Sequence, residues 1–267
     1  MSLAVAHQRR FGVEIECGNR RGYDDVRRQL SNAGFNYQSV GSDGSGVEVR
    51  TRILQGKEGF SELKSMMEFL RGIECYVTQS DGMHVHHDCP ELVENPAKTL
   101  QVVKSWVANR SNIDPFVAPA RRNRSPWRPA DVDRLEAIVS GEEFILERNP
   151  CYRPNSRYPE ERERMVRRPV NRSHGFGRND LNISSLREHG TIEIRIHEGS
   201  LDGDQAEAWI KMCQRFLHDV IKRASPMPRA PDREVLLNRL RLSKRARAVL
   251  DAKVAAGSYP QPRLSRY

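Results

Sequence analysis

Four short segments of the sequence place charged or metal-binding side chains at every second position. The clearest is segment 191–198, in which Glu193, Arg195 and His197 alternate with three isoleucines. A period of two is typical of a β-strand with one buried face. The polar face of an ordinary surface strand would be a loose mixture of Thr, Ser and Lys. A row of acid, guanidinium and imidazole is better suited to presenting a metal ligand beside a group that binds phosphate.

The same alternation occurs in segments 11–16, 47–50 and 82–86, where polar and aliphatic side chains occupy opposite faces. The simplest assembly of the four strands is a single sheet. We expect its apolar face to pack under helices. We expect its other face to carry Glu14, Glu16, Glu48, His84, His86, Glu193 and Arg195.

These side chains together predict a metal site. Several carboxylates on one face repel one another, and some would have to be protonated if no cation were bound. Carboxylate oxygens suit Mg²⁺ or Mn²⁺, and one added imidazole slightly favours Mn²⁺. Cations beside arginines would form a receptor for a polyphosphate. A lone histidine or glutamate would more simply be structural, but the shared polarity of four strands makes coincidence a weak explanation.

Two loops leave alternatives open. The glycine-rich turn at 41–46 either brings backbone N–H groups and Asp43 to a phosphate or metal, or simply connects a hairpin. Segment 148–178 has no clear period and is rich in Arg, Pro, Asn and Gly. A loop of this length is often a lid or a binding segment. It either grips an anionic substrate or is a solvated excursion.

The remaining periodicity predicts the elements that would hold this face in place. Apolar residues spaced at helical intervals predict helices at 24–33, 58–71, 96–110, 131–139 and 204–223. Asp204 and Glu207 would form a capping box at the start of the last of these. A basic helix at 232–256 follows a proline-rich break. We also expect strands at 35–40, 75–79 and 181–184, and a turn at 187–190.

Length and composition limit the class of protein. A chain of 267 residues suits one large domain, or one domain with an appendage. It contains no apolar run as long as a membrane span, and its first ten residues lack the apolar core of a signal peptide. The five cysteines are scattered and form no C-x-x-C pair, which indicates reduced thiols. We therefore expect a cytoplasmic protein with no membrane partner.

The net charge of +9 is concentrated at the end of the chain. From Ser225 onward there are ten Lys and Arg against three Asp and Glu, whereas the rest carries 34 against 32. We expect a catalytic domain at 1–224 and a basic helical extension at 225–267. The extension could bind a nucleic acid, although a run of charge is more often a solvated face.

The motifs resemble those of the amidoligase family, whose members are carboxylate–amine ligases related to glutamine synthetase and glutamate–cysteine ligase. The resemblance rests on segments 11–16, 82–86, 181–183 and 190–195, and it covers about residues 10–224. It implies an α+β fold like the glutamine synthetase catalytic domain. Such a fold has a curved, mainly antiparallel sheet, with helices on its convex face and ATP and divalent metals on its concave face.

The resemblance also implies a role for each matched residue. Metal ligands would be Glu14, Glu16, Glu48, His84 and Glu193, with Asp43 as a candidate extra ligand. His86 would lie on the nucleotide side, and Arg195 would bind phosphate and act in catalysis with Glu193 and Glu48. Further candidates for cofactor, substrate or phosphate contacts are Asn182, Arg110, Arg121 and Arg122.

The implied reaction joins a carboxylate substrate and an amine substrate, which could be small molecules or peptides. ATP, bound with Mg²⁺ or Mn²⁺, phosphorylates the carboxylate to an acyl phosphate, and the amine then displaces phosphate to form an amide. Two other functions remain open. His84 and His86 with Asp88 could belong to a metal-dependent hydrolase, and the basic tail could belong to a nucleic-acid-binding protein.

Overall fold

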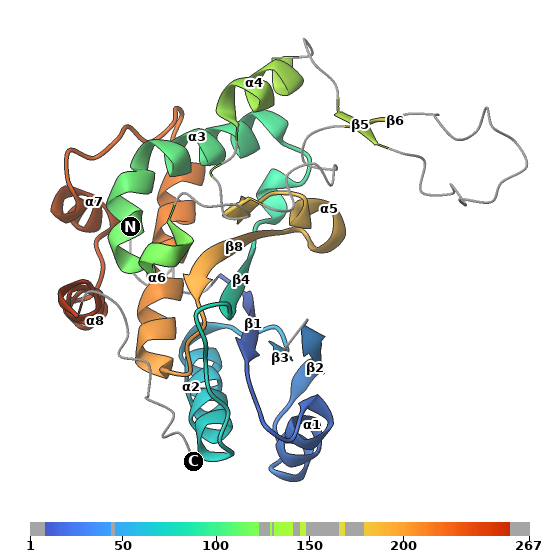
Figure 1. Cartoon of the computed structure of the whole chain (residues 1–267). Coiled ribbons are helices and arrows are strands. Elements are labelled where there is room, and N and C mark those ends of the chain that lie inside the picture. The colour runs from blue at the N-terminus through green and yellow to red at the C-terminus, as the bar shows by residue number, and fades with distance from the viewer. Residues whose placement is uncertain are drawn as a thin grey trace, which may run out of the picture.

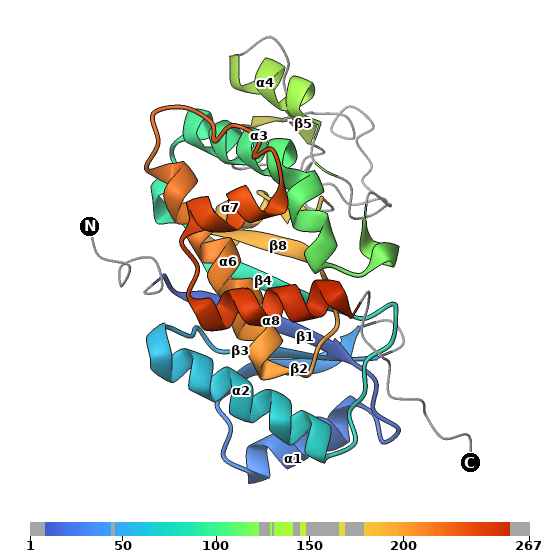
Figure 2. The same cartoon turned by 90° about the vertical axis from the view of Figure 1, so that its left-hand side faces the viewer.

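The computed structural model describes residues 9–43, 46–122, 129, 131–140, 145–147, 166–168 and 179–256. Its centre is an open six-stranded antiparallel sheet with helices packed over one face, which confirms the expected α+β class. Helices α2, α6 and α8 lie in front of the sheet in Figure 2. In Figure 1 the same helices lie to the left of the strands.

The strands follow the spatial order β2-β3-β1-β4-β8-β7. The first strand of the chain therefore lies inside the sheet. All four strands expected from alternating polarity are present, but His197 departs from the expected face, because it is buried and its ring packs against Trp209. The strand bounds are β1 Phe11–Cys17, β2 Tyr37–Asp43, β3 Gly46–Thr51, β4 Gly82–Asp88, β7 Leu181–Asn182 and β8 Thr191–Glu198. A separate two-stranded sheet pairs β5 Ile145–Glu147 with β6 Val166–Arg168.

The apolar face of the sheet forms the core with the helices. Burial alternates along β1, where Phe11, Val13 and Ile15 are buried and the residues between them are partly exposed. Phe11 stacks on Phe60 of helix α2 (Gly56–Gly72), with ring centroids 4.9 Å apart. Burying one such side chain contributes about 1.5–3 kcal/mol to stability. Because this packing buries one face of β1, functional side chains can project only from the opposite face.

The structure describes eight α-helices, and the five that periodicity predicted before the tail are all present, with differences only at their ends. Their bounds are α1 Tyr23–Asn32, α2 Gly56–Gly72, α3 Pro96–Ile113, α4 Val132–Ser140, α5 Ser185–His189, α6 Gly203–Ile221, α7 Arg233–Leu240 and α8 Lys244–Ala255. The predicted capping box at Asp204 is wrong. Asp202 caps α6 instead, because its side chain accepts hydrogen bonds from the N–H groups of Asp204 and Gln205.

Three other expectations are also corrected. Segment 75–79 is not a strand, since only Tyr76 forms an isolated bridge, with Gly18. The expected turn at 187–190 is largely the short helix α5, which ends at Gly190 with a φ of 66°. The basic helix at 232–256 is two helices, because Arg241 adopts a left-handed φ of 50° and ends α7.

The two loops with open alternatives have different outcomes. Asp43 pairs with Gly46 across β2 and β3, which confirms the hairpin interpretation of the glycine-rich turn. The Asp43 side chain, and the residues at 44–45, lie outside the described part of the chain. Most of the loop at 148–178 also lies outside it, so the lid hypothesis stays a prediction.

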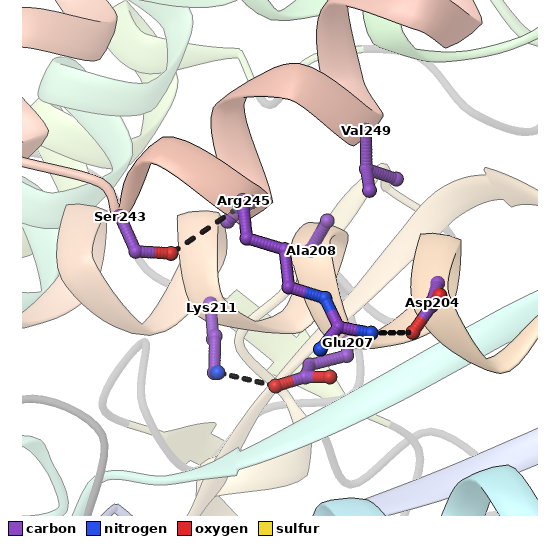
Figure 3. Close-up of a pocket in the computed structure, with 8 residues that line it drawn as sticks. Asp204, Glu207, Ala208, Lys211, Ser243, Arg245 and Val249 are labelled. Atoms are coloured by element: carbon purple, nitrogen blue, oxygen red, sulfur yellow. Dashed lines mark hydrogen bonds and ion pairs between the residues drawn. The ribbon is translucent and has the colours of Figure 1, made fainter.

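The C-terminal helices pack against the rest of the fold. Leu236, Leu237, Leu240 and Leu250 are buried in the same core as the sheet. Figure 3 shows the contact between α6 and α8, where Arg245 lies 2.9 Å from Asp204. The predicted boundary at 224–225 stays a prediction, but α7 and α8 are structurally joined to the residues before it. Within the described residues, no helix has both the length and the apolar character needed to cross a bilayer.

Candidate active site

Strand register assembles the polar face of the sheet into two rows. Glu14 on β1 pairs with Arg50 on β3 and with His84 on β4. Glu193 on β8 pairs with His86 on β4 and with Asn182 on β7. Directly paired residues of antiparallel strands share a face, so the register alone brings acids, imidazoles and a guanidinium together.

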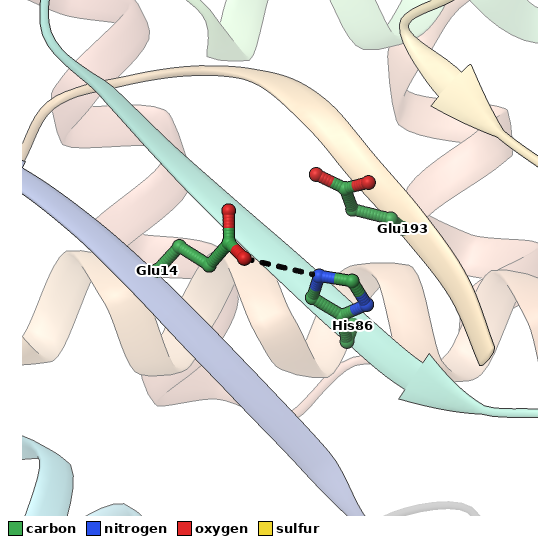
Figure 4. A group of neighbouring side chains, drawn as sticks. All are labelled: Glu14, His86 and Glu193. Atoms are coloured by element: carbon green, nitrogen blue, oxygen red, sulfur yellow. Dashed lines mark ion pairs between the residues drawn. The ribbon is translucent and has the colours of Figure 1, made fainter. Parts of the chain in front are cut away.

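Glu14, His86 and Glu193 form a cluster suited to a cation. One ligand atom from each lies within 4.8 Å of the other two. Figure 4 shows the three side chains, from β1, β4 and β8, directed into a common space. His86 Nε2 lies 3.6 Å from Glu14 Oε1. Oxygens bound to one Mg²⁺ at about 2.1 Å lie at most about 4 Å apart, so small side-chain shifts would complete such a site.

His84 lies deeper than His86 and is 4% exposed. Its Nδ1 lies 3.3 Å from Glu14 Oε2 and 3.6 Å from Glu193 Oε1, and its Nε2 lies 3.5 Å from Glu16 Oε1. Both ring nitrogens therefore face carboxylates. Burial tends to raise the pKa of Glu14, but its hydrogen bonds with His84 and His86 hold that pKa well below its usual range. Glu14 is therefore ionised and able to bind a cation.

Because Gly82 has no side chain, it leaves room for the side chains of His84, Glu16 and Arg121. A Cβ there would lie 2.8 Å from His84 Nε2, 3.0 Å from Arg121 Nη1 and 3.1 Å from Glu16 Oε2. The Gly82 N–H donates to Glu16 Oε2 at 2.5 Å. An alanine at this position would push Glu16 and His84 away from the places they now occupy.

Two arginines flank the acidic cluster. Arg50 Nε lies 3.0 Å from Glu14 Oε1, and its Nη2 lies 2.6 Å from Glu48 Oε1. On the opposite side, Arg195 forms an ion pair with Glu193. Both guanidinium groups are partly exposed, so each can also face a bound anion.

Hydroxyl and amide groups orient the ligands from behind. Thr191 Oγ1 lies 3.0 Å from His86 Nδ1, and Ser185 Oγ lies 3.1 Å from the same nitrogen. Asn182 Nδ2 donates to Glu193 Oε2 at 2.6 Å. A metal-binding histidine usually donates its second N–H to such a neighbour. With His86 Nδ1 turned toward Thr191, its Nε2 is directed at Glu14 and the cluster.

A broad cavity over this face brings together most of the residues predicted for the site. It is lined by Glu14, Glu16, Glu48, His84, His86, Asn182, Glu193 and Arg195. Among the lining residues that the sequence-based assignment missed, Arg50, Thr191 and Ser185 contact Glu14 or His86 directly. The alternation that singles out Glu48 and Glu193 also places Arg50 and Thr191 on this face. For Ser185, which follows β7, the alternation provides no signal.

Three predicted arginines do not line this cavity. Arg110 is buried, with its Nε 2.6 Å from Asp180 Oδ2, and it also pairs with Asp114. Arg122 donates to the carbonyl oxygen of Val117. Short contacts with nearby protein groups thus hold both side chains away from the cavity.

Arg121 lies beneath the cluster rather than in the cavity. It is 1% exposed, and its Nη2 donates to Ser80 O at 2.7 Å. Burial lowers the pKa of Arg121, while the negative charges of Glu16 and Glu198 oppose that shift. The positive charge of Arg121 therefore stabilises the negative charge of Glu16 from inside the protein.

Comparison with known protein families identifies the chain. Residues 22–217 match the family model described as "Putative amidoligase enzyme". The chain belongs to the amidoligase family. Membership of this family supports a ligase-type function, in agreement with the resemblance seen in the motifs. The matched range begins after β1, so the assignment of Glu14 and Glu16 rests on the motif resemblance of segment 11–16 and on geometry. A comparison with curated proteins found no match.

The donor set of this amidoligase fits a divalent cation of the Mg²⁺ or Mn²⁺ class. Glu14 and Glu193 offer hard carboxylate oxygens, which suit both ions, and His86 offers one borderline imidazole nitrogen, which slightly favours Mn²⁺. Glu16 and His84 lie within reach as further ligands. The sulfur atoms of Cys17, Cys75, Cys89 and Cys213 are buried elsewhere, outside the cavity lining.

Proposed function

We propose that this amidoligase joins a carboxylate to an amine at the expense of ATP, through an acyl-phosphate intermediate. The observation that carries the proposal is the set of Glu14, His86 and Glu193 between Arg50 and Arg195. Carboxylates able to hold cations, flanked by guanidinium groups, are what a reactive polyphosphate requires. Together with the family, this arrangement supports phosphoryl transfer.

Divalent cations bound at Glu14, Glu193, His86 and their neighbours would neutralise charge on the ATP phosphates. The protein's own side chains would do the rest. Arg195, at the edge of the cluster and 30% exposed, would contact the transferring phosphoryl group. Its planar guanidinium can donate two parallel hydrogen bonds to phosphate oxygens.

The reaction needs no nucleophile from the protein. An oxygen of the substrate carboxylate attacks the γ-phosphorus and ADP leaves, which produces the acyl phosphate. The amine nitrogen then attacks the acyl carbon, the C–O bond to phosphate breaks, and inorganic phosphate leaves with that bonding pair. The amine must also lose a proton, for which Glu48, lining the same cavity, is a suitable base. The tasks left to the protein are alignment and the exclusion of water.

The proposal is tested by ADP release with Mg²⁺ or Mn²⁺ across a panel of carboxylates. Hydroxylamine serves as a surrogate amine that traps acyl phosphates as hydroxamates. We expect ADP and hydroxamate to form together, only with a suitable carboxylate. Glu193→Gln should abolish both, whereas Glu62→Gln, outside the cavity lining, should retain them. Hydrolysis of ATP at the same rate without any carboxylate would rule out the ligase and favour a hydrolase.

A nucleic acid is a second proposed partner, through exposed basic residues of the C-terminal extension. Arg241, at the end of α7, and Lys244, the first residue of α8, are exposed, whereas Arg245 pairs with Asp204 and Arg247 pairs with Glu234. Reversing the charge of Arg241 and Lys244 should weaken RNA or DNA binding and reduce its salt dependence. Reversing the exposed Arg20 and Arg21 is the matched control. Equal loss in both variants would mean that only net charge matters.

We also propose a cytoplasmic location, because the four described cysteines are free and buried. The fifth, Cys151, lies outside the described residues.

A further inference from the structure

Arg50 occupies a position between two carboxylates of the acidic cluster. Its Nε lies 3.0 Å from Glu14 Oε1 and its Nη2 lies 2.6 Å from Glu48 Oε1. Its side chain is 45% exposed. The Arg50 guanidinium thus links the carboxylate of Glu14 on β1 to the carboxylate of Glu48 on β3, and it remains accessible from the cavity.

One contact of Arg50 uses a carboxylate that a divalent cation would also use. Glu14 is one of the three residues whose ligand atoms converge, and its Oε1 also faces His86 Nε2 at 3.6 Å. A carboxylate oxygen held by a guanidinium is a poorer ligand, and two positive groups beside one oxygen repel each other. Arg50 and a cation therefore compete for Glu14.

The position of Arg50 also matches that of Arg195 on the other side of the cluster. Arg195 pairs with Glu193 on β8, and Arg50 pairs with Glu14 from the neighbouring β3. Both guanidinium groups line the cavity. If cations took over the carboxylates, both groups would be left facing the same space from opposite sides, where phosphate oxygens would bind.

We infer that Arg50 is an exchange residue, which holds Glu14 and Glu48 in place without a cation and turns to a nucleotide phosphate when a divalent cation takes Glu14. This inference rests on the proposed function, because only a phosphate substrate gives Arg50 its second partner. It makes Arg50 a binding residue for the nucleotide, in addition to Arg195.

The inference predicts changes of opposite sign in two affinities. Arg50→Gln removes the competing charge, so the affinity for Mn²⁺ alone should rise about three- to tenfold. The matched control is Arg52→Gln. Arg52 lines the same cavity and is 47% exposed, but it pairs with Glu62 instead of the cluster. Its substitution should leave Mn²⁺ affinity unchanged. Isothermal titration with Mn²⁺ and no nucleotide measures this, and unchanged or weaker binding by Arg50→Gln would overturn the exchange.

The second measurement is the affinity for a non-hydrolysable ATP analogue at saturating Mn²⁺. We expect Arg50→Gln to bind the analogue at least about tenfold more weakly, and Arg50→Lys to retain part of the affinity because the charge remains. Thermal unfolding of each variant confirms that it is folded.

Two failures are distinguishable in this measurement. If the unmodified protein binds the analogue and Arg50→Gln binds it equally well, the inference is overturned and the proposed function stands. If the unmodified protein binds Mn²⁺ but no analogue, the proposed function fails, and the nucleotide role of Arg50 fails with it.

Discussion

Lys253 Nζ lies 2.7 Å from Glu198 Oε1, which joins the last helix of the described chain to the last residue of β8. Both side chains are less than a tenth exposed. Lys253 Nζ also lies 2.8 Å from His197 Nε2. Because Glu193 and Arg195 are on the same strand, α8 helps to hold the strand that carries the proposed chemistry.

Replacing Lys253 with methionine should therefore destabilise the protein. Breaking a buried pair leaves Glu198 charged and uncompensated, which typically costs about 3–5 kcal/mol of the free energy of unfolding. Urea denaturation measures this loss, and Lys244→Met, at an exposed position of the same helix, is the matched control. Combining Lys253→Met with Glu198→Gln should cost less than the sum of the single changes. Full additivity would show that the two side chains do not act as a pair.

The same pair predicts how stability depends on pH. Burial alone would raise the pKa of Glu198, but His197, Lys253 and the Ala118 N–H lower it to about 2. Since the folded state favours the ionised form, this stabilisation is fully present above about pH 4.5, the unfolded value. It is lost as the pH falls toward 2. When the pH is lowered from about 5 to 2.5, the urea concentration at the unfolding midpoint should fall less for Glu198→Gln than for the unmodified protein. An equal fall in both proteins would contradict this role of Glu198.

Replacing Glu193 and replacing Arg195 should impair different steps, namely binding for Glu193 and turnover for Arg195. Glu193→Gln removes a ligand charge, so metal and nucleotide affinity should fall together. Arg195→Lys keeps the charge but loses the planar guanidinium, so the loss should be mainly in turnover, by about a hundredfold or more. Hydroxamate formation and nucleotide affinity, measured side by side, separate the two effects. Full turnover in both Arg195→Lys and Arg195→Ala would reduce Arg195 to a structural partner of Glu193.

Thr191 should affect metal binding without being a ligand. Thr191→Val removes the hydroxyl 3.0 Å from His86 Nδ1 but keeps the shape of the side chain. Loss of such a supporting group typically weakens metal binding about 10–100-fold. Thr191→Ser keeps the hydroxyl and is the matched control. The measurement is Mn²⁺ affinity without nucleotide, and equal affinity in Thr191→Val would mean that Ser185 alone orients the ring.

The polar face of the sheet could be predicted from sequence because alternation is a local property. Placing Ile192, Ile194 and Ile196 in the core forces Glu193 and Arg195 onto the opposite face, whatever the neighbouring strands are. Local pattern does not determine which charges find partners. Arg110 looks like a free phosphate ligand in sequence, but the buried Asp180, seventy residues later, binds it.

Tertiary contacts also explain the misjudged elements. Segment 75–79 has the composition of a strand, but among the described residues its one β-bridge is the pair of Tyr76 and Gly18. Arg241 gave no sequence signal for a helix end, because a left-handed conformation at a non-glycine residue depends on its surroundings. The tail therefore seemed to be one basic helix, whereas it forms two helices, of which α7 buries three leucines in the core and α8 buries Leu250.

The strand order has a consequence for folding of the chain during its synthesis. β1 and β4 are adjacent in the sheet, but β8, which completes the other side of β4, follows more than a hundred residues later. Until β8 arrives, the β4 edge is unpaired, and closing so long a loop is a slow step. Glu193 meets Glu14 and His86 only at that step. A half-synthesised chain thus lacks Glu193, one of the three groups of the proposed cation site, and any stabilisation by a bound cation would be complete only in the finished fold.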